Sequence, residues 1–122
     1  EFIAKRNKIR KVYSKELNNL PLSTLEIKEN ILSSCHLFVI RLKNKSEEYH
    51  KNVFQRLRKE NIGVQLHYLP VHLHPFFRNL GFKEGDFPES EHYSKNSISL
   101  PIYPKLSYSK QIRVIECLRK IL

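Results

Sequence analysis

The stretch HLFVIRL, residues 36–42, together with VQLHY, residues 64–68, decides the fold. The first is a compact run of β-branched and other apolar residues, which predicts a largely buried strand. The second alternates apolar and polar residues and ends before Pro70, which predicts a second strand. Two strands separated by about 20 residues leave room for one helix between them.

The intervening residues have the start and stop signals of that helix. Ser46 is a candidate N-cap, and it is followed by Glu47 and Glu48, whose carboxylates suit the positive end of the helix dipole. Residues 61–63, Asn-Ile-Gly, predict its C-terminal end. The apolar face of the predicted helix consists of Tyr49, Val53, Phe54 and Leu57.

Helices are also predicted at both ends of the chain. Residues 2–19 carry apolar side chains near the 3.6-residue period, and the other side is rich in Lys and Arg. Ser107 is a candidate N-cap for a last helix, which turns Ile112, Ile115 and Leu118 inward. The apolar positions of the first helix are Phe2, Ile9, Val12, Tyr13 and Leu17.

The rest of the chain is less regular. Residues 97–100, Ser-Ile-Ser-Leu, predict a short strand that stops at Pro101, and residues 23–30 predict a connection with room for another short strand. Proline and glycine interrupt residues 69–88, where we expect a short helix at 75–80 and a second one beginning near Pro88.

These elements predict an α/β fold in which a small sheet is flanked by helices, within one domain spanning residues 1–122. The chain starts with Glu and contains no Met, so we expect a piece of a longer protein. It has neither an apolar run long enough for a membrane span nor the apolar core of a signal peptide. We therefore expect a cytoplasmic protein without a membrane partner.

The net charge of +10 suggests binding to an acidic partner. Nearly all of this net positive charge lies in residues 1–15 and 105–122, and both segments are predicted helices. Basic helix faces can bind phosphates, but they are more often simply solvated. We expect no nucleic-acid partner, and a stand-alone basic binding module stays open as the alternative function.

Residues 67–74, HYLPVHLH, are the candidate site, because they leave a predicted strand and enter a loop held by prolines. Three interpretations are open. His67, His72 and His74, with Glu84 or Asp86, could bind a metal, although this spacing matches no strong metal motif. Each histidine could instead satisfy a backbone carbonyl. Imidazole and phenol groups also suit sugar hydroxyls, and a protonated histidine suits a diphosphate.

Sequence signals of a complete active site are missing. The chain has no glycine-rich phosphate loop and no G-x-S-x-G nucleophile motif, and neither Cys35 nor Cys117 has the setting of a nucleophile. Two cysteines are too few for a disulfide framework. We therefore expect no self-sufficient active site within this chain, and we assign it no catalytic or metal-binding residue.

Three motifs in this order resemble the C-terminal third of the DegT/DnrJ/EryC1/StrS aminotransferases. They are HYLPVH at residues 67–72, GDFPESE at 85–91 and SISLPIYPKLS at 97–107. The resemblance runs from the first predicted helix to the last. It is strongest to transaminases that make UDP-linked 4-amino-4,6-dideoxy-N-acetylhexosamines in pathways of the pseudaminic acid type.

The resemblance implies the small C-terminal domain of the aspartate-aminotransferase type of fold, in a homodimeric enzyme. Such enzymes use pyridoxal phosphate to move an amino group, usually from glutamate, to a keto sugar nucleotide. It implies that the cofactor and its lysine lie in a large domain absent from this chain, so that this chain alone binds no cofactor and is inactive. The implied substrate-binding residues are His67, Tyr68, His72, His36 and Tyr103. The first helix would expose a stripe through Phe2, Ile9 and Tyr13, where it would pack on the large domain.

Overall fold

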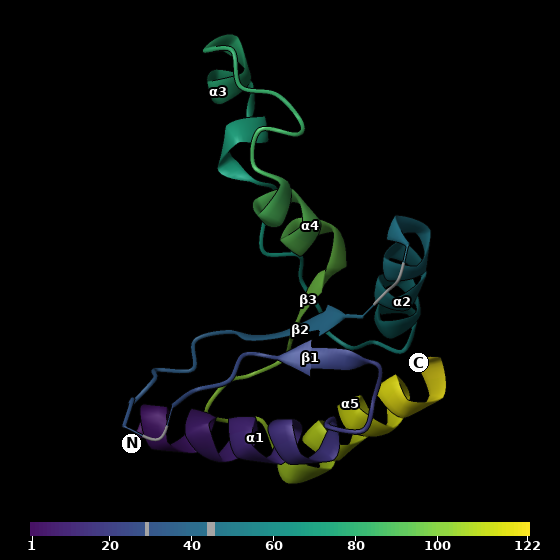
Figure 1. Ribbon diagram of the computed structural model, residues 1–122. Coiled ribbons are helices and arrows are strands. Elements are labelled where there is room, and N and C mark those ends of the chain that lie inside the picture. The colour runs from purple at the N-terminus through teal and green to yellow at the C-terminus, as the bar shows by residue number, and fades with distance from the viewer. Residues whose placement is uncertain (29, 44–45) are drawn as a thin grey trace.

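A three-stranded antiparallel sheet lies at the centre of the fold (Figure 1). The computed structural model describes residues 1–28, 30–43 and 46–122. The strands β1 (Leu22–Thr24), β2 (Phe38–Leu42) and β3 (Ser97–Leu100) lie in that order across the sheet. β2 begins two residues later than predicted, because Cys35 has a positive φ of 46° and only Phe38 takes up the pairing with Leu100. The short strand expected near residues 23–30 is β1.

The predicted helices are confirmed as α1 (Phe2–Glu16), α2 (Glu47–Lys59), α3 (Pro75–Asn79), α4 (Pro88–Asn96) and α5 (Tyr108–Ile121), although α1 ends three residues earlier than predicted. The 3-10 helix η1 (Val71–Leu73) was not predicted. The Ser46 hydroxyl accepts a hydrogen bond from the Tyr49 amide, and the Ser107 hydroxyl accepts one from the Lys110 amide. Asn61 ends α2 with a φ of 56°, a left-handed conformation that asparagine tolerates better than most residues. In the described residues, no helix is both long and apolar enough to cross a bilayer.

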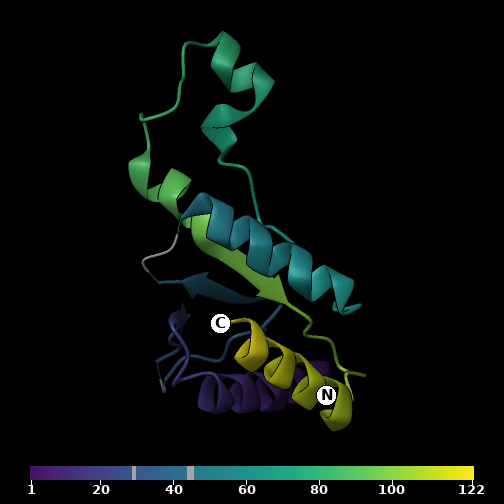
Figure 2. The ribbon, with the colours of Figure 1, turned by 90° about the vertical axis from the view of Figure 1, so that its right-hand side faces the viewer.

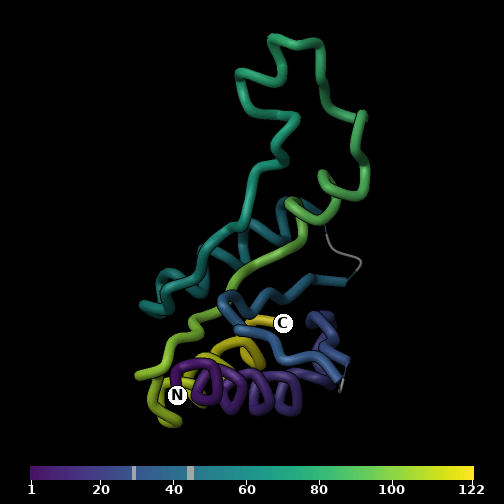
Figure 3. Tube along the Cα trace, turned by 90° about the vertical axis from the view of Figure 1, so that its left-hand side faces the viewer, coloured from purple at the N-terminus to yellow at the C-terminus, as the bar shows by residue number. Residues whose placement is uncertain are grey.

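The core lies between the sheet and the two terminal helices, which run beside each other on the same side of it (Figures 1 and 3). Ile40 and Ile98 on the sheet and Ile115 on α5 are fully buried. Polar contacts also join the two helices, since the Gln111 side chain donates to the carbonyl of Ile9 at 2.7 Å. These contacts explain why helices from opposite ends of the sequence form one layer.

We expected an exposed apolar stripe on α1, and this expectation is wrong for two of its three residues. Ile9 and Tyr13 are buried against the sheet and α5, and only Phe2 is exposed, at 64%. The sequence pattern identified the apolar face of the helix correctly. It could not show that α5 covers that face, because α5 lies about 100 residues away in the sequence.

Replacing Tyr13 with phenylalanine is expected to cost about 1 kcal/mol at neutral pH, because the hydroxyl donates to the Pro101 carbonyl at 3.0 Å. Burial, with a contribution from Tyr103, raises the pKa of the Tyr13 phenol. The folded state therefore holds this proton more tightly than the unfolded state, and the wild-type protein loses stability as the pH rises above about 10. Urea unfolding at several alkaline pH values should show this loss in the wild type and a smaller one in Tyr13→Phe. Equal pH dependence in both proteins would contradict the assignment.

The second strand predicted at residues 64–68 is wrong. Gln65 and Ser99 form one isolated antiparallel bridge, in which each amide donates to the other carbonyl, at 3.2 and 2.9 Å. In this register His67 lies opposite Ser97, which directly follows helix α4. Although Ile98 and Ser97 of β3 lie opposite residues 66 and 67 in this register, the segment makes only this one bridge among the described residues.

The chain between this bridge and α4 extends away from the sheet as an arm, which we define as residues 69–87. The arm contains η1 and α3, and Figures 1, 2 and 3 show it projecting from the body of the molecule. Pro70 and His72 are the buried residues of the arm, and α3 buries none of its side chains. The shape of the arm therefore depends on contacts at its base.

Candidate functional site

His67 and Tyr68 form a contact pair where the chain leaves the sheet for the arm. The Nδ1 atom of His67 lies 2.7 Å from the hydroxyl oxygen of Ser99, which is buried. The ring of Tyr68 meets the His67 ring edge-on, with 4.4 Å between centroids. Tyr68 is 69% exposed and His67 is partly exposed, so this pair presents an imidazole and a phenol to solvent.

A surface hollow of about 420 Å³ adjoins Tyr68, between α2, the base of the arm and α4. Lys95 stands at its edge, 2.7 Å from a carboxylate oxygen of Glu84 and 3.9 Å from one of Glu47. The hydrogen bond that Lys95 donates to Glu84 raises the pKa of the Lys95 ammonium, so the group stays charged. The hollow is lined by Glu47, His50, Lys51, Phe54, Leu66, Tyr68, Leu69, Leu73, Glu91, Ser94 and Lys95. Its apolar floor and charged edge suit a polar organic ligand.

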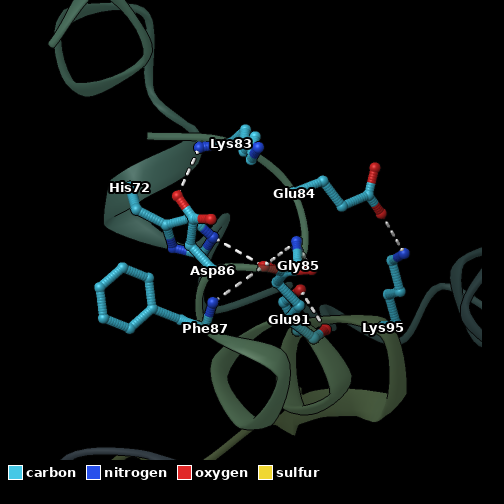
Figure 4. A network of polar contacts seen from close by, with 9 residues as sticks. His72, Lys83, Glu84, Gly85, Asp86, Phe87, Glu91 and Lys95 are labelled. Carbon is cyan, nitrogen blue, oxygen red and sulfur yellow. Dashed lines mark hydrogen bonds and ion pairs between the residues drawn. The ribbon is translucent and has the colours of Figure 1, made fainter. Parts of the chain in front are cut away.

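His72 is buried at the base of the arm and lines a surface hollow there together with Phe77, Phe82 and Phe87. Its Nε2 atom donates to a carboxylate oxygen of Glu91 at 2.8 Å, and both side chains are more than nine-tenths buried (Figure 4). The His72 ring also packs against Phe87, with 4.8 Å between centroids. Within this chain, His72 therefore helps to fix the shape of the arm through its contacts with Glu91 and Phe87.

Glu91 gathers further hydrogen bonds from the last part of the arm (Figure 4). The Gly85 amide lies 2.9 and 3.0 Å from its two carboxylate oxygens, and the Phe87 amide donates at 3.4 Å. Gly85 has a φ of 96°, a conformation that favours glycine and turns its amide toward the carboxylate. Burial raises the pKa of Glu91, but the hydrogen bonds from His72 and the two amides outweigh it, so this pKa lies below its usual range. Glu91 therefore holds both ends of the arm together as a carboxylate.

His36 and Tyr103 lie away from this pair. His36 precedes β2 and Tyr103 follows β3, so both lie beyond the Phe38–Leu100 pair, at the end of the sheet opposite the arm. Both are exposed. The structure thus places the predicted site residues at two separate ends of the sheet, with His67 and Tyr68 in contact at the arm end.

The three histidines of the metal interpretation each have a different partner. His67 contacts Ser99, His72 contacts Glu91, and His74 donates to the carbonyl of Leu69 at 3.3 Å. Across residues 1–28, 30–43 and 46–122, no three His, Cys, Asp or Glu side chains are grouped so that they could hold a metal ion.

The basic ends of the chain are partly used within the fold. Arg119 on α5 forms an ion pair with Glu16 on α1 at 2.8 Å, and Arg113 donates to the Glu60 carbonyl at 2.7 Å. Some of the charge that suggested an acidic partner therefore serves to join helices.

Lysine side chains show whether this chain could hold pyridoxal phosphate as a Schiff base. Every lysine in the part of the chain that the structure describes is exposed. Desolvation is one of the ways in which a protein activates a lysine that forms a Schiff base, and it needs a lysine shielded from solvent. We therefore assign the cofactor no contact in the part of the chain that the structure describes.

Comparison with known proteins identifies the relatives of the chain. Residues 1–119 match the sequence model of the DegT/DnrJ/EryC1/StrS aminotransferase family. The chain belongs to this family. SpsC of Bacillus subtilis, a spore coat polysaccharide biosynthesis protein, is 33% identical over 121 residues, which cover 96% of this chain and 31% of SpsC. The UDP-4-amino-4,6-dideoxy-N-acetyl-beta-L-altrosamine transaminase of Campylobacter jejuni is 30% identical over 106 residues, 86% of this chain and 28% of that enzyme.

A solved aminotransferase structure confirms the expected fold. The PLP-form of Spr1654 from Streptococcus pneumoniae, assigned as a sugar aminotransferase, aligns with a TM-score of 0.91 and 28% identity, covering 99% of this chain and 32% of Spr1654. The chain thus spans about a third of the length of these DegT/DnrJ/EryC1/StrS relatives. It has the fold of one part of a DegT/DnrJ/EryC1/StrS enzyme.

Ser99 and Glu91 are the two residues of the site that the sequence interpretation missed. Both lie within motifs characteristic of the family, SISLP and GDFPESE. The alternation of Ser97, Ile98, Ser99 and Leu100 was a usable signal, because it directs both serines to the sheet face opposite the two apolar residues. No comparable pattern pointed to Glu91, whose partner His72 lies 19 residues earlier.

Proposed function

We propose that this chain is the small C-terminal domain of a pyridoxal-phosphate-dependent aminotransferase that acts on a sugar nucleotide. In this proposal the enzyme transfers an amino group from glutamate to a UDP-linked 4-keto-6-deoxy sugar, in the synthesis of nucleotide sugars for surface glycans. The enzyme is a cytoplasmic homodimer, and the chain alone is inactive.

The match to the DegT/DnrJ/EryC1/StrS family over residues 1–119 carries this proposal. The Campylobacter relative supports the substrate class, since its name states a UDP-linked 4-amino-4,6-dideoxy sugar. The exposed His67–Tyr68 pair is chemically suited to a sugar, because imidazole and phenol both form hydrogen bonds with hydroxyl groups.

We assign the predicted residues different roles in substrate binding. His67 and Tyr68 contact the sugar nucleotide, while His72 acts indirectly by fixing the arm that follows them. His36 and Tyr103, at the other end of the sheet, contact a different part of the substrate than the first pair does.

An amino-transfer assay on the whole protein tests the proposed function. The protein is incubated with pyridoxal phosphate, glutamate and a UDP-linked 4-keto-6-deoxy-N-acetylhexosamine, and mass spectrometry follows the amino sugar and 2-oxoglutarate. Parallel assays with dTDP-linked 3-keto and 4-keto sugars test the substrate class. Formation of both products with the UDP-linked substrate supports the proposal, and activity with the dTDP-linked sugars alone would contradict its substrate class.

The isolated 122-residue chain is expected to form no Schiff base with pyridoxal phosphate, because its described lysines are all exposed. Absorption spectra of the purified chain with the cofactor, before and after borohydride reduction, provide the measurement. Stoichiometric attachment to one lysine after reduction, located by peptide mapping, would show that the chain holds the cofactor itself. Free lysine at the same concentration controls for nonspecific attachment.

A further inference from the structure

Ser99 is held rigidly at the point where it meets His67. On one side it pairs with Val39 of β2, and on the other its amide and carbonyl both bond to Gln65. Its side chain is 4% exposed. With the backbone fixed on both sides, the hydroxyl oxygen has a fixed place 2.7 Å from Nδ1 of His67.

The Ser99 hydroxyl has one hydrogen-bond partner among the described residues, and that partner is Nδ1 of His67. Leaving a buried hydroxyl proton without an acceptor costs free energy, so such protons are in most cases donated. The neutral imidazole has one unprotonated nitrogen, which can accept a hydrogen bond from this hydroxyl, and one protonated nitrogen, which can only donate. If Ser99 donates to Nδ1, the imidazole proton must be on Nε2.

The other nitrogen of the His67 ring is accessible. Nε2 has no partner in the described part of the chain. The buried side-chain nitrogen and oxygen atoms that lack a partner there are Nε of Arg6, Nε of Arg10 and the hydroxyl of Ser97. Since Nε2 of His67 is not one of them, it contacts solvent.

We propose that Ser99 is a positioning residue that fixes His67 as the tautomer protonated on Nε2, so that His67 presents an N–H donor to its ligand. The ligand group that fits this donor is an acceptor oxygen of a sugar hydroxyl, a keto group or a phosphate. The role of His67 in ligand binding rests on the proposed function, whereas the assignment of the His67 tautomer does not.

Histidine-selective ¹⁵N NMR of the whole protein tests the tautomer directly. His50 provides an internal reference, because its Nε2 lies 3.0 Å from the carbonyl of Ser97, an atom that can only accept, so this ring must carry its proton on Nε2. At about pH 8.5, above the usual titration range of imidazole, His67 is expected to show the same pattern as His50. A proton on Nδ1 of His67 would overturn the proposal.

Two serine variants test the role of the hydroxyl. Ser99→Ala is expected to lose the single-tautomer pattern of His67, while Ser99→Thr, which keeps a hydroxyl, retains it. An unchanged pattern in Ser99→Ala would contradict the proposal. The pattern of His50 should be the same in every variant, which separates a local effect from unfolding. If Ser99→Ala does not fold, the wild-type spectrum still decides the tautomer.

Amino-transfer kinetics then test the use of the donor. Loss of one hydrogen bond corresponds to roughly a tenfold fall in kcat/KM for Ser99→Ala, with Ser99→Thr closer to the wild type. His67→Gln, whose amide can place a donor near the Nε2 position, is expected to keep more activity than His67→Asn. Equal loss in both would contradict donation by Nε2. If the whole protein shows no amino transfer at all, the proposed function fails while the tautomer result stands.

Discussion

Glu91→Ala is expected to release the arm from the body of the protein. The change removes the carboxylate that binds Nε2 of His72 and the amides of Gly85 and Phe87, and it leaves these three donors without this acceptor. Amide hydrogen exchange should show the result, because the protection of the Gly85 and Phe87 amides depends on this side chain. We expect exchange at both amides to accelerate by roughly tenfold or more, given the strength of hydrogen bonds to a charged acceptor.

Glu89→Ala is the matched control for this experiment. Glu89 lies in the same first turn of α4 and interacts with the same helix dipole, but it is exposed. Its replacement should leave exchange at Gly85 and Phe87 near the wild-type rate. Similar acceleration in both variants would show that the helix end, and not the buried carboxylate, holds the arm.

The pH dependence of the arm follows from the same carboxylate. The pKa of Glu91 is lower in the folded state than in an unfolded chain, so its stabilising effect is present above the unfolded pKa of about 4.3. This effect is lost as the pH falls further, through the folded pKa. Limited proteolysis across this acidic range should therefore cut residues 69–87 faster as the pH falls in the wild type. Glu91→Ala should be cut fast throughout.

Leu118→Ala is expected to destabilise the fold by about 2–5 kcal/mol, the usual cost of removing a fully buried leucine side chain. Leu118 lies on α5 and has no exposed surface. It belongs to the core in which α1, the sheet and α5 meet. Urea unfolding followed by circular dichroism measures the change as a lower midpoint with an unchanged slope.

Leu32→Ala makes the same chemical change at a position that is 82% exposed. Its effect should stay within about 0.5 kcal/mol, as is usual for surface substitutions. If both variants lose the same stability, then α5 does not pack on the core as the structure shows.

The arm separates the two kinds of residue that the HYLPVH motif contains. His67 and Tyr68 lie in contact at its base and reach solvent, whereas His72, four positions after Tyr68, is buried against Glu91. The residue type could not distinguish His67 from His72, since a histidine can bind either a ligand or another side chain of the protein. The two histidine rings differ in burial, and the burial of His72 depends on Glu91, which lies later in the sequence.

Local sequence signals were sufficient for the helices. Ser46 and Ser107 each accept the capping hydrogen bond that their positions predicted, and Asn61 ends α2 where expected. Such signals depend on residues three or four positions apart, so they hold in the sequence as well as in the fold. The apolar faces of α1 and α5 were predicted for the same reason.

The sequence by itself determined the helices, the strands β2 and β3, and the motifs that show the family. Only the tertiary structure decided that residues 64–68 form one bridge instead of a strand, because strand pairing depends on how β3, which lies about 30 residues later in the sequence, is placed beside them. Only the tertiary structure paired His72 with Glu91 and His67 with Ser99, across 19 and 32 residues. Contacts over such separations leave no periodic pattern in the sequence, because they arise from the packing of the whole chain.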